Sequence, residues 1–179
     1  MKNAQLWPFI ALVIGFIILP PVSHAENADR SINDAGEGGL GPSGLPLPRF
    51  ASLRSSEVNL RTGPGTRYPI EWVYQRENMP LEITAEYDIW RRVRDWEGSE
   101  GWVHKSSLSG RRSFITTGKT RSLYKSDDLS APVIAYLHPL VIGTIESCSA
   151  FWCEVSVSSY TGYLQKSEMW GVYPQETIK

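Results

Sequence analysis

The chain has 179 residues, enough for one ordinary domain or two small ones, and its formal net charge is -1. Because basic and acidic residues nearly balance, the composition implies no nucleic-acid partner. Aromatic residues are unusually frequent, with seven Trp, eight Tyr and five Phe. Trp and Tyr favour strands and binding surfaces, so the composition favours β structure.

Residues 1–25 have the organisation of a signal peptide. Lys2 gives a positive start, Leu6 to Leu19 is almost wholly apolar, and a Pro-Pro pair ends the run. Ser23 and Ala25 are the small residues that a signal peptidase requires, so we expect cleavage after Ala25. A retained anchor is the alternative, but the run is short for a spanning helix, which needs about 20 residues. The sequence therefore predicts a periplasmic or secreted protein with no transmembrane segment after cleavage.

Residues 26–49 are predicted to be a disordered linker. They include five glycines and three prolines and almost no aliphatic periodicity. Such a segment buries too little apolar surface to offset its ordering entropy. Two interpretations of its last part, Leu45 to Arg49, stand open. It is either a polyproline-like spacer, which we favour, or a segment that docks onto a neighbouring module.

The rest of the chain contains an internal repeat with a period of about 62 residues. In both copies a short apolar segment precedes a Trp by about 30 residues, and a Gly-aromatic-aliphatic triplet follows that Trp. Each copy is near the lower size at which a domain folds alone. The matched pairs are Val58–Arg61 with Arg121–Tyr124, Trp90 with Trp152, and Gly101–Val103 with Gly162–Leu164.

Both copies are predicted to form short strands. Leu81, Ile83 and Ala85 alternate with polar residues, which is the period of a half-buried strand. Residues 152–157 alternate in the same way, with Cys153 and Val155 on one face. Gly, Pro, Asp and Ser clusters separate the strands, and no helical period of comparable length competes. Short strands at close spacing favour a small barrel.

The stretch from Val58 to Ile70, VNLRTGPGTRYPI, resembles the signature of bacterial SH3-like (SH3b) domains. In that family a strand enters a Gly-Pro-Gly loop and returns through Tyr-Pro. The second copy has Lys-Ser-Asp-Asp in place of Gly-Pro-Gly. The resemblance implies an all-β fold of two tandem small SH3-like β-barrels after the signal peptide and linker. We expect module 1 over residues 50–110, a divergent module 2 over 111–173, and a tail over 174–179.

Cys148 and Cys153 enclose a short loop between two predicted strands. An exported protein meets an oxidising environment, and similar modules carry a comparable pair. We therefore predict a disulfide that closes a hairpin. Free core thiols and half of a metal site are the alternatives, although a zinc site needs four ligands and only His104 and His138 remain to help.

The sequence gives no sign of a catalytic site. It contains no Gly-x-Ser-x-Gly elbow, and no Gly-Lys-Ser/Thr follows the Gly-Pro-Gly stretch. The two cysteines are better explained as a pair than as a nucleophile. We therefore predict no enzymatic activity, no metal and no cofactor. An unrecognised hydrolase is the alternative, since a carboxylate pair that forms only in the folded chain leaves no sequence signal.

Binding is the favoured function, and the candidate contact residues are aromatic and arginine side chains. An alternative role for the aromatics is to cover a barrel end or a module interface. Trp102, in a Gly-Trp-Val strand, is expected in the core. Arginines of the first repeat suit carboxylate ligands, although a solvated mixed-charge surface is the favoured interpretation. The candidates are Arg67, Tyr68, Trp90, Arg92, Trp96 and Trp152.

The resemblance implies a noncatalytic cell-envelope module that recognises peptidoglycan or a wall-associated peptide, because SH3b domains often target wall hydrolases or anchor proteins. A periplasmic interaction module that binds an extended peptide of a partner protein is the second interpretation. SH3-like barrels serve many roles, so the fold alone supports either weakly.

Overall fold

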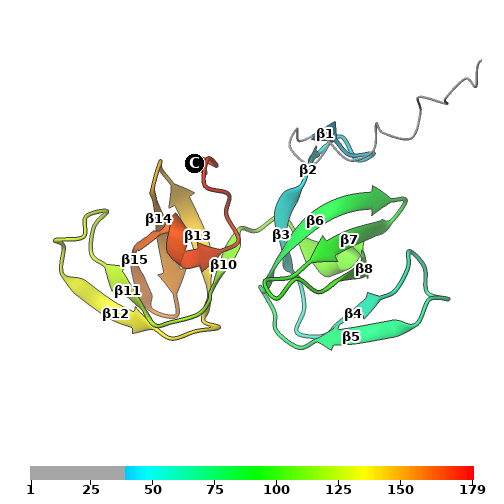
Figure 1. Ribbon diagram of the computed structural model, residues 1–179, viewed down its shortest axis with the longest axis horizontal. Coiled ribbons are helices and arrows are strands. Elements are labelled where there is room, and N and C mark those ends of the chain that lie inside the picture. Colours follow the sequence, from blue (N-terminus) through cyan, green and yellow to red (C-terminus); the bar gives the residue numbers. More distant parts are fainter. Residues whose placement is uncertain (1–38) are drawn as a thin grey trace, which may run out of the picture. The chain divides into compact units, whose positions relative to one another are not determined.

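The computed structural model describes residues 39–179, which form strands joined by turns and two short 3-10 turns (Figure 1). The predicted signal peptide, residues 1–25, and the first part of the predicted linker lie outside the described residues. No helix within residues 39–179 has the length and apolar character needed to cross a membrane.

The first module is one antiparallel sheet of seven strands in the order β5-β4-β8-β7-β6-β3-β9. A 3-10 turn, η1 (Lys105–Ser107), separates its last two strands. The strands are β3 (Arg49–Leu53), β4 (Val58–Arg61), β5 (Ile70–Tyr74), β6 (Pro80–Tyr87), β7 (Trp90–Arg94), β8 (Glu100–His104) and β9 (Leu108–Ser109).

The second module repeats this topology strand for strand, in the order β12-β11-β15-β14-β13-β10-β16. A 3-10 turn, η2 (Lys166–Glu168), again precedes the last strand. The predicted all-β fold and internal repeat are therefore confirmed. The strands are β10 (Ser113–Thr116), β11 (Arg121–Tyr124), β12 (Val133–Leu137), β13 (Ile142–Cys148), β14 (Trp152–Val157), β15 (Tyr160–Gln165) and β16 (Met169–Trp170).

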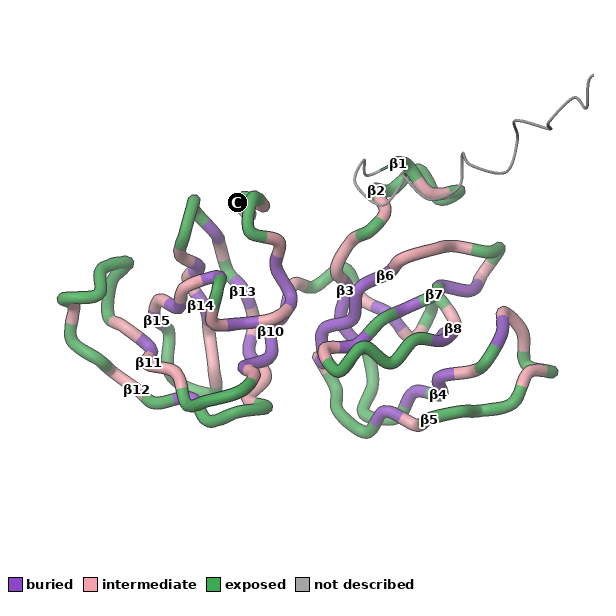
Figure 2. Tube along the Cα trace, viewed as in Figure 1, coloured by how far each residue is buried: buried purple, intermediate pink, exposed green. Residues whose placement is uncertain are grey.

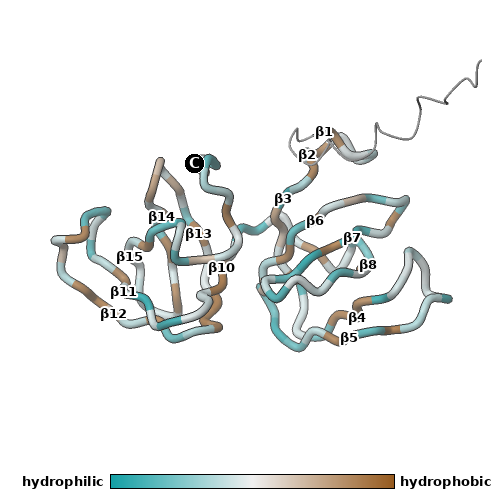
Figure 3. Tube along the Cα trace, in the orientation of Figure 1, coloured by the Kyte–Doolittle hydropathy of each residue, from teal (hydrophilic) through white to brown (hydrophobic). Residues whose placement is uncertain are grey.

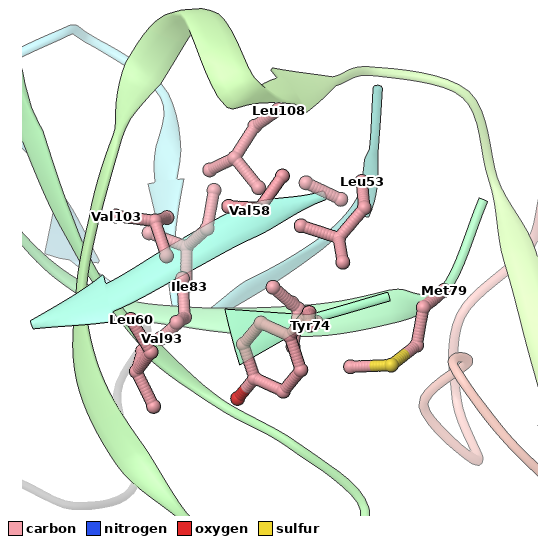
Figure 4. Packing of buried hydrophobic residues seen from close by; sticks show 11 residues of the cluster. Leu53, Val58, Leu60, Tyr74, Met79, Ile83, Val93, Val103 and Leu108 are labelled. Carbon is pink, nitrogen blue, oxygen red and sulfur yellow. The ribbon is translucent and has the colours of Figure 1, made fainter. Parts of the chain in front are cut away.

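Each module has its own hydrophobic core. Buried residues recur along the strands of both modules in Figure 2, and hydrophobic stretches occur in the strands of both modules in Figure 3. In the first core, aliphatic side chains from different strands converge around Tyr74 (Figure 4). The second core centres on Phe114, which is fully buried opposite Gly143. A Cβ atom at Gly143 would lie 2.5 Å from the Phe114 ring, so this glycine makes room for it.

The predicted alternation along β6 holds only as far as a bulge. Leu81 and Ile83 are buried as expected, but the register shifts between Ile83 and Ala85, and Ala85 is only half-buried. Glu82, predicted on the polar face, is also buried. Arg94 and the Tyr173 hydroxyl both donate hydrogen bonds to its carboxylate, which satisfies the charge inside the protein. A bulge of this kind re-aims the residues that follow it.

The structure corrects the prediction of a disordered linker for residues 39–49. Strands β1 (Gly39–Leu40) and β2 (Pro46–Leu47) pair as a small hairpin, and Leu47 packs against the first core. Ser43 in the hairpin loop donates two hydrogen bonds of 2.8 Å to Glu86, through its N–H and its Oγ. The composition of this segment suggested too little burial to order it. The acceptor that holds it lies more than 40 residues away along the chain, so the local sequence contains no sign of it.

Several side chains connect the two modules. The Ser52 and Ser113 hydroxyls lie 2.5 Å apart in the interior, and Ser52 also donates to the Arg111 carbonyl. The Phe50 ring meets Trp170 edge-on, with centroids 4.9 Å apart, and lies 4.7 Å from Tyr173. These contacts join two modules that are each near the lower size at which a domain folds alone.

Candidate functional site

The glycine-rich loop between β4 and β5 is closely packed on itself. The Tyr68 ring covers Gly63, where a Cβ atom would lie 2.5 Å from the ring. Arg61 donates from Nη1 to the carbonyls of Thr66 and Tyr68, at 3.2 and 2.8 Å. The exposed Arg67 guanidinium lies over the Tyr68 ring, 5.1 Å from its centroid. The structure thus brings the predicted contact residues Arg67 and Tyr68 together on an ordered loop.

The outer face of the sheet beside this loop carries a hollow of about 210 Å³. Arg92 on β7 is paired directly opposite Trp102 on β8, and Arg61 on β4 pairs with Trp102 from the other side. The Arg92 guanidinium forms a 2.5 Å ion pair with Glu100. We call this site the Trp102 hollow, and its lining residues are Thr62, Glu71, Arg92, Glu100, Gly101 and Trp102.

The expectation that Trp102 lies in the core is wrong. Trp102 is half-buried, and its neighbours Gly101 and Val103 are the buried residues of β8. Gly101 is at an inward position because a Cβ there would lie 2.6 Å from the Leu60 side chain and 2.9 Å from the Arg61 carbonyl. The alternation of strand residues therefore places Trp102 outside, and the Gly-Trp-Val triplet already contained that signal.

Two other predicted contact residues lie inside the first module. Trp90 is 8% exposed and meets His104 edge-on, with ring centroids 5.6 Å apart. Trp96 is partly buried against the first core. Its turn is held by buried Asp95, which accepts hydrogen bonds from the Tyr74 hydroxyl and the backbone of Ser99. Trp90 is a predicted contact residue, but His104 on the paired strand packs against its ring.

Comparisons with known proteins agree with this geometry. A family model described as bacterial SH3 domain matches residues 54–110 and again residues 118–171. The chain belongs to the bacterial SH3 domain family. Domains of this family are noncatalytic, are typically cell-wall binding modules and are usually extracytoplasmic. No curated protein matches the sequence significantly.

Among solved structures, the chain is similar to NlpC2 and NlpC1 from Trichomonas vaginalis. NlpC2 is 14% identical with a TM-score of 0.32, over 68% of this chain and 47% of that one. NlpC1 is 13% identical with a TM-score of 0.32, over 69% of this chain and 45% of that one. The chain thus spans less than half the length of either protein.

The second SH3 domain presents different chemistry at the equivalent face. Tyr163 and Tyr124 are paired where the first domain has Trp102 and Arg61. The predicted contact residue Trp152 is half-buried and meets Tyr124 edge-on, with ring centroids 5.6 Å apart. Glu154 takes the place of Arg92. The first SH3 domain thus offers arginine at this face, and the second offers aromatic rings and a carboxylate.

The two SH3 domains also differ in the link across their central hairpins. In the second domain Cys148 and Cys153 face each other and form the predicted disulfide, with Cα atoms 4.0 Å apart. Cys148 lies three residues after Ile145, and Cys153 lies two residues before Val155, the partner of Ile145. Glu86 and Arg91 have the same positions relative to the paired Ile83 and Val93 of the first domain. There the Arg91 Nε lies 3.1 Å from Glu86 Oε1, and the Glu86 side chain is 1% exposed. A buried ion pair therefore replaces the disulfide.

The Glu86 carboxylate has three partners, Arg49, Arg91 and Ser43. It accepts hydrogen bonds from Arg49 at 2.6 Å and from Ser43, in addition to the ion pair with Arg91. Burial by itself raises the pKa of Glu86, but the hydrogen bonds from Arg49 and Ser43 outweigh it and hold the pKa at about 2. The carboxylate therefore stays charged at every pH the protein meets near neutrality.

The end of the chain covers the disulfide of the second SH3 domain. Ile178 and Cys148 exchange backbone hydrogen bonds of 2.8 and 3.2 Å. The buried Lys166 ammonium donates to three carbonyls, those of Ala150, Pro174 and Glu176. The segment predicted as a tail, residues 174–179, is thus held against the hairpin that carries the disulfide. Among residues 39–179 no cluster of His, Cys, Asp or Glu has the composition of a metal site.

Proposed function

We propose that the chain is an exported, noncatalytic cell-envelope protein that recognises peptidoglycan or a wall-associated peptide through the outer face of its first SH3 domain. The observation that carries the proposal is the Trp102 hollow, where half-buried Trp102 is paired across the sheet with Arg61 on one side and Arg92 on the other, in a family of typical wall-binding modules. An indole offers a large apolar surface at low entropic cost, and a guanidinium matches a carboxylate in geometry. Wall peptides combine carboxylates with small apolar side chains.

The proposal includes the organisation of the chain. Residues 1–25 act as a signal peptide, and the two SH3 domains occupy approximately residues 50–110 and 111–173. The disulfide supports export, since such bonds persist in oxidising compartments. Mass spectrometry of the exported protein tests the cleavage site directly, and a chain that still carries residues 1–25 would instead indicate a retained anchor.

A second candidate is the binding of an extended peptide from a partner protein. Strand β5 is at the edge of the first sheet, and its residues Ile70 and Trp72 are 48% and 61% exposed. An exposed apolar edge strand is a template for adding a further strand. This candidate uses a different part of the domain, so single variants separate it from wall binding.

Truncation of Trp102 is expected to weaken wall binding about tenfold, as loss of a central aromatic contact does. The measurement is co-sedimentation of the exported protein with purified peptidoglycan, comparing wild type, Trp102→Ala and Trp72→Ala. Tyr136→Ala, an exposed aromatic position on β12 of the second domain, is the matched control. Trp90→Ala, suggested by the sequence, is unsuitable because Trp90 is buried.

Each outcome has a clear meaning. Loss of pelleting in Trp102→Ala alone supports the proposed function. Loss in Trp72→Ala alone moves the site to the β5 edge. If wild type does not pellet, peptidoglycan is not the direct ligand, and release of soluble wall fragments by wild type would contradict the noncatalytic assignment.

A further inference from the structure

A second hollow, of about 340 Å³, opens between the β1–β2 hairpin and the first SH3 domain. Its walls come from three distant parts of the chain, so it exists only because residues 39–49 fold back onto the domain. We call it the hairpin pocket. Three of its lining residues are basic (Arg49, Arg91 and Lys105), and the others are Leu45, Phe50, Ala51, Leu108, Ser109 and Gly110.

The basic side chains of the hairpin pocket leave uncompensated positive charge. Arg49 and Arg91 share a single carboxylate, that of Glu86, at 2.6 and 3.1 Å. None of the residues that line the pocket is acidic. Lys105 is exposed, and within residues 39–179 its side chain forms neither an ion pair nor a hydrogen bond. Two guanidinium groups, one ammonium group and one carboxylate therefore give the site a net positive charge.

The two guanidinium groups of the pocket are also held in place before any ligand arrives. Arg91 donates from Nη1 to the carbonyls of Asp88 and Trp90, both at 2.9 Å, and its side chain is only 10% exposed. Arg49 donates from Nη1 to the Pro46 carbonyl. The Lys105 N–H donates to the Ile89 carbonyl at 2.8 Å, which fixes the base of that side chain beside the β6–β7 turn. Fixed donors lose little entropy when they bind an anion.

The remaining walls define the rest of the ligand. Leu45, Ala51 and Leu108 place aliphatic surface next to the basic groups. An anion that carries small apolar substituents fits this combination, whereas a bare phosphate leaves the aliphatic surface without a partner. We propose that the hairpin pocket binds the free carboxylate of a short peptide that ends in alanine, such as the D-alanine end of a wall stem peptide. This inference rests on the proposed function and names a ligand group for it.

The test is a titration of the exported full chain with diacetyl-L-lysyl-D-alanyl-D-alanine and with its C-terminal amide, followed by calorimetry. Wild type binds the acid, and the amide binds at least about tenfold more weakly because it lacks the charge that the pocket complements. Lys105→Gln weakens binding of the acid by about tenfold while leaving the melting temperature unchanged, because the Lys105 side chain has no partner to lose. Lys125→Gln, an exposed lysine of the second domain, is the control and binds as wild type does.

Three results would overturn the proposal. One is equal binding of acid and amide, and another is equal binding by wild type and Lys105→Gln. The third is displacement of the peptide by inorganic phosphate that binds with a dissociation constant as low as that of the peptide. The pocket would then be a general anion site. Co-sedimentation with peptidoglycan shows whether such a result contradicts only the peptide site or also the proposed wall binding. If wild type and Lys105→Gln pellet equally with peptidoglycan while neither binds the peptide, wall binding stands and the hairpin pocket is not its site.

Discussion

Replacement of Glu86 by glutamine is expected to lower the free energy of unfolding by about 3 kcal/mol at pH 7. The variant leaves Arg49 and Arg91 without the carboxylate that both contact, at 2.6 and 3.1 Å. It also weakens the anchor of the β1–β2 hairpin, since Ser43 donates to the same group. Loss of one partner from a buried ion pair is costly because the remaining charge stays buried.

The contribution of Glu86 to the free energy of unfolding decreases as the pH falls. A carboxyl group with a pKa of about 2 in the folded chain and an ordinary value of 4.5 contributes about 3 kcal/mol above its unfolded pKa. This contribution is lost as the pH falls from about 5 towards 2. Urea unfolding at pH 7, 5 and 3, followed by tryptophan fluorescence, measures it. The stability gap between wild type and variant should narrow steadily over that range.

Glu100→Gln is the matched control for this measurement. Glu100 also pairs with an arginine, Arg92, but the two side chains are 36% and 49% exposed. Exposed pairs contribute about 0 to 1 kcal/mol, so this variant should unfold nearly as wild type does. Equal losses for Glu86→Gln and Glu100→Gln would show that burial does not distinguish the two pairs and would contradict the argument.

Removal of the disulfide by the double change Cys148→Ala and Cys153→Ala is expected to cost about 2 kcal/mol, since the bond closes a short loop. Both cysteines are buried, at 3% and 0% exposure, and the last strand-like residues of the chain cover them. Reduction of the native protein should therefore be slow and should accelerate in urea. The measurement is unfolding of wild type and double variant, each with and without dithiothreitol.

The reductant itself provides the control for the disulfide. Dithiothreitol should lower the stability of wild type to that of the double variant and leave the double variant unchanged. A thiol assay on denatured, unreduced wild type should detect no free thiol. Two reactive thiols in that assay would show that the pair is not oxidised in the purified protein, and the predicted stability difference would then disappear.

The sequence predicted the fold well because the fold depends on local patterns. Alternation along the strands reports which face is buried, the repeat of Trp90 at Trp152 reports that one unit occurs twice, and the structure repeats the topology accordingly. The Gly-Pro-Gly loop was recognisable because Gly63 must accommodate the Tyr68 ring. The disulfide followed from the short spacing of two cysteines and the expected compartment.

The candidate site was predicted less well because it depends on contacts between distant segments. Trp90 has the sequence pattern of an exposed residue, but its place against His104 is set by the pairing of β7 with β8. The hairpin pocket requires Arg49 and Arg91 to meet at Glu86, and no local pattern links these residues. Trp102 is the exception, since strand alternation alone would have placed it outside.

The interchange of an ion pair and a disulfide at one register position has a consequence for the chain as a whole. Protonation of Glu86 breaks the ion pair of the first domain, and reduction breaks the Cys148–Cys153 disulfide of the second. Acid does not break the disulfide, and a reductant does not break the ion pair. Acid alone or a reductant alone therefore removes the link in one SH3 domain and leaves the link in the other intact, so the two copies share a fold but not a chemical weakness.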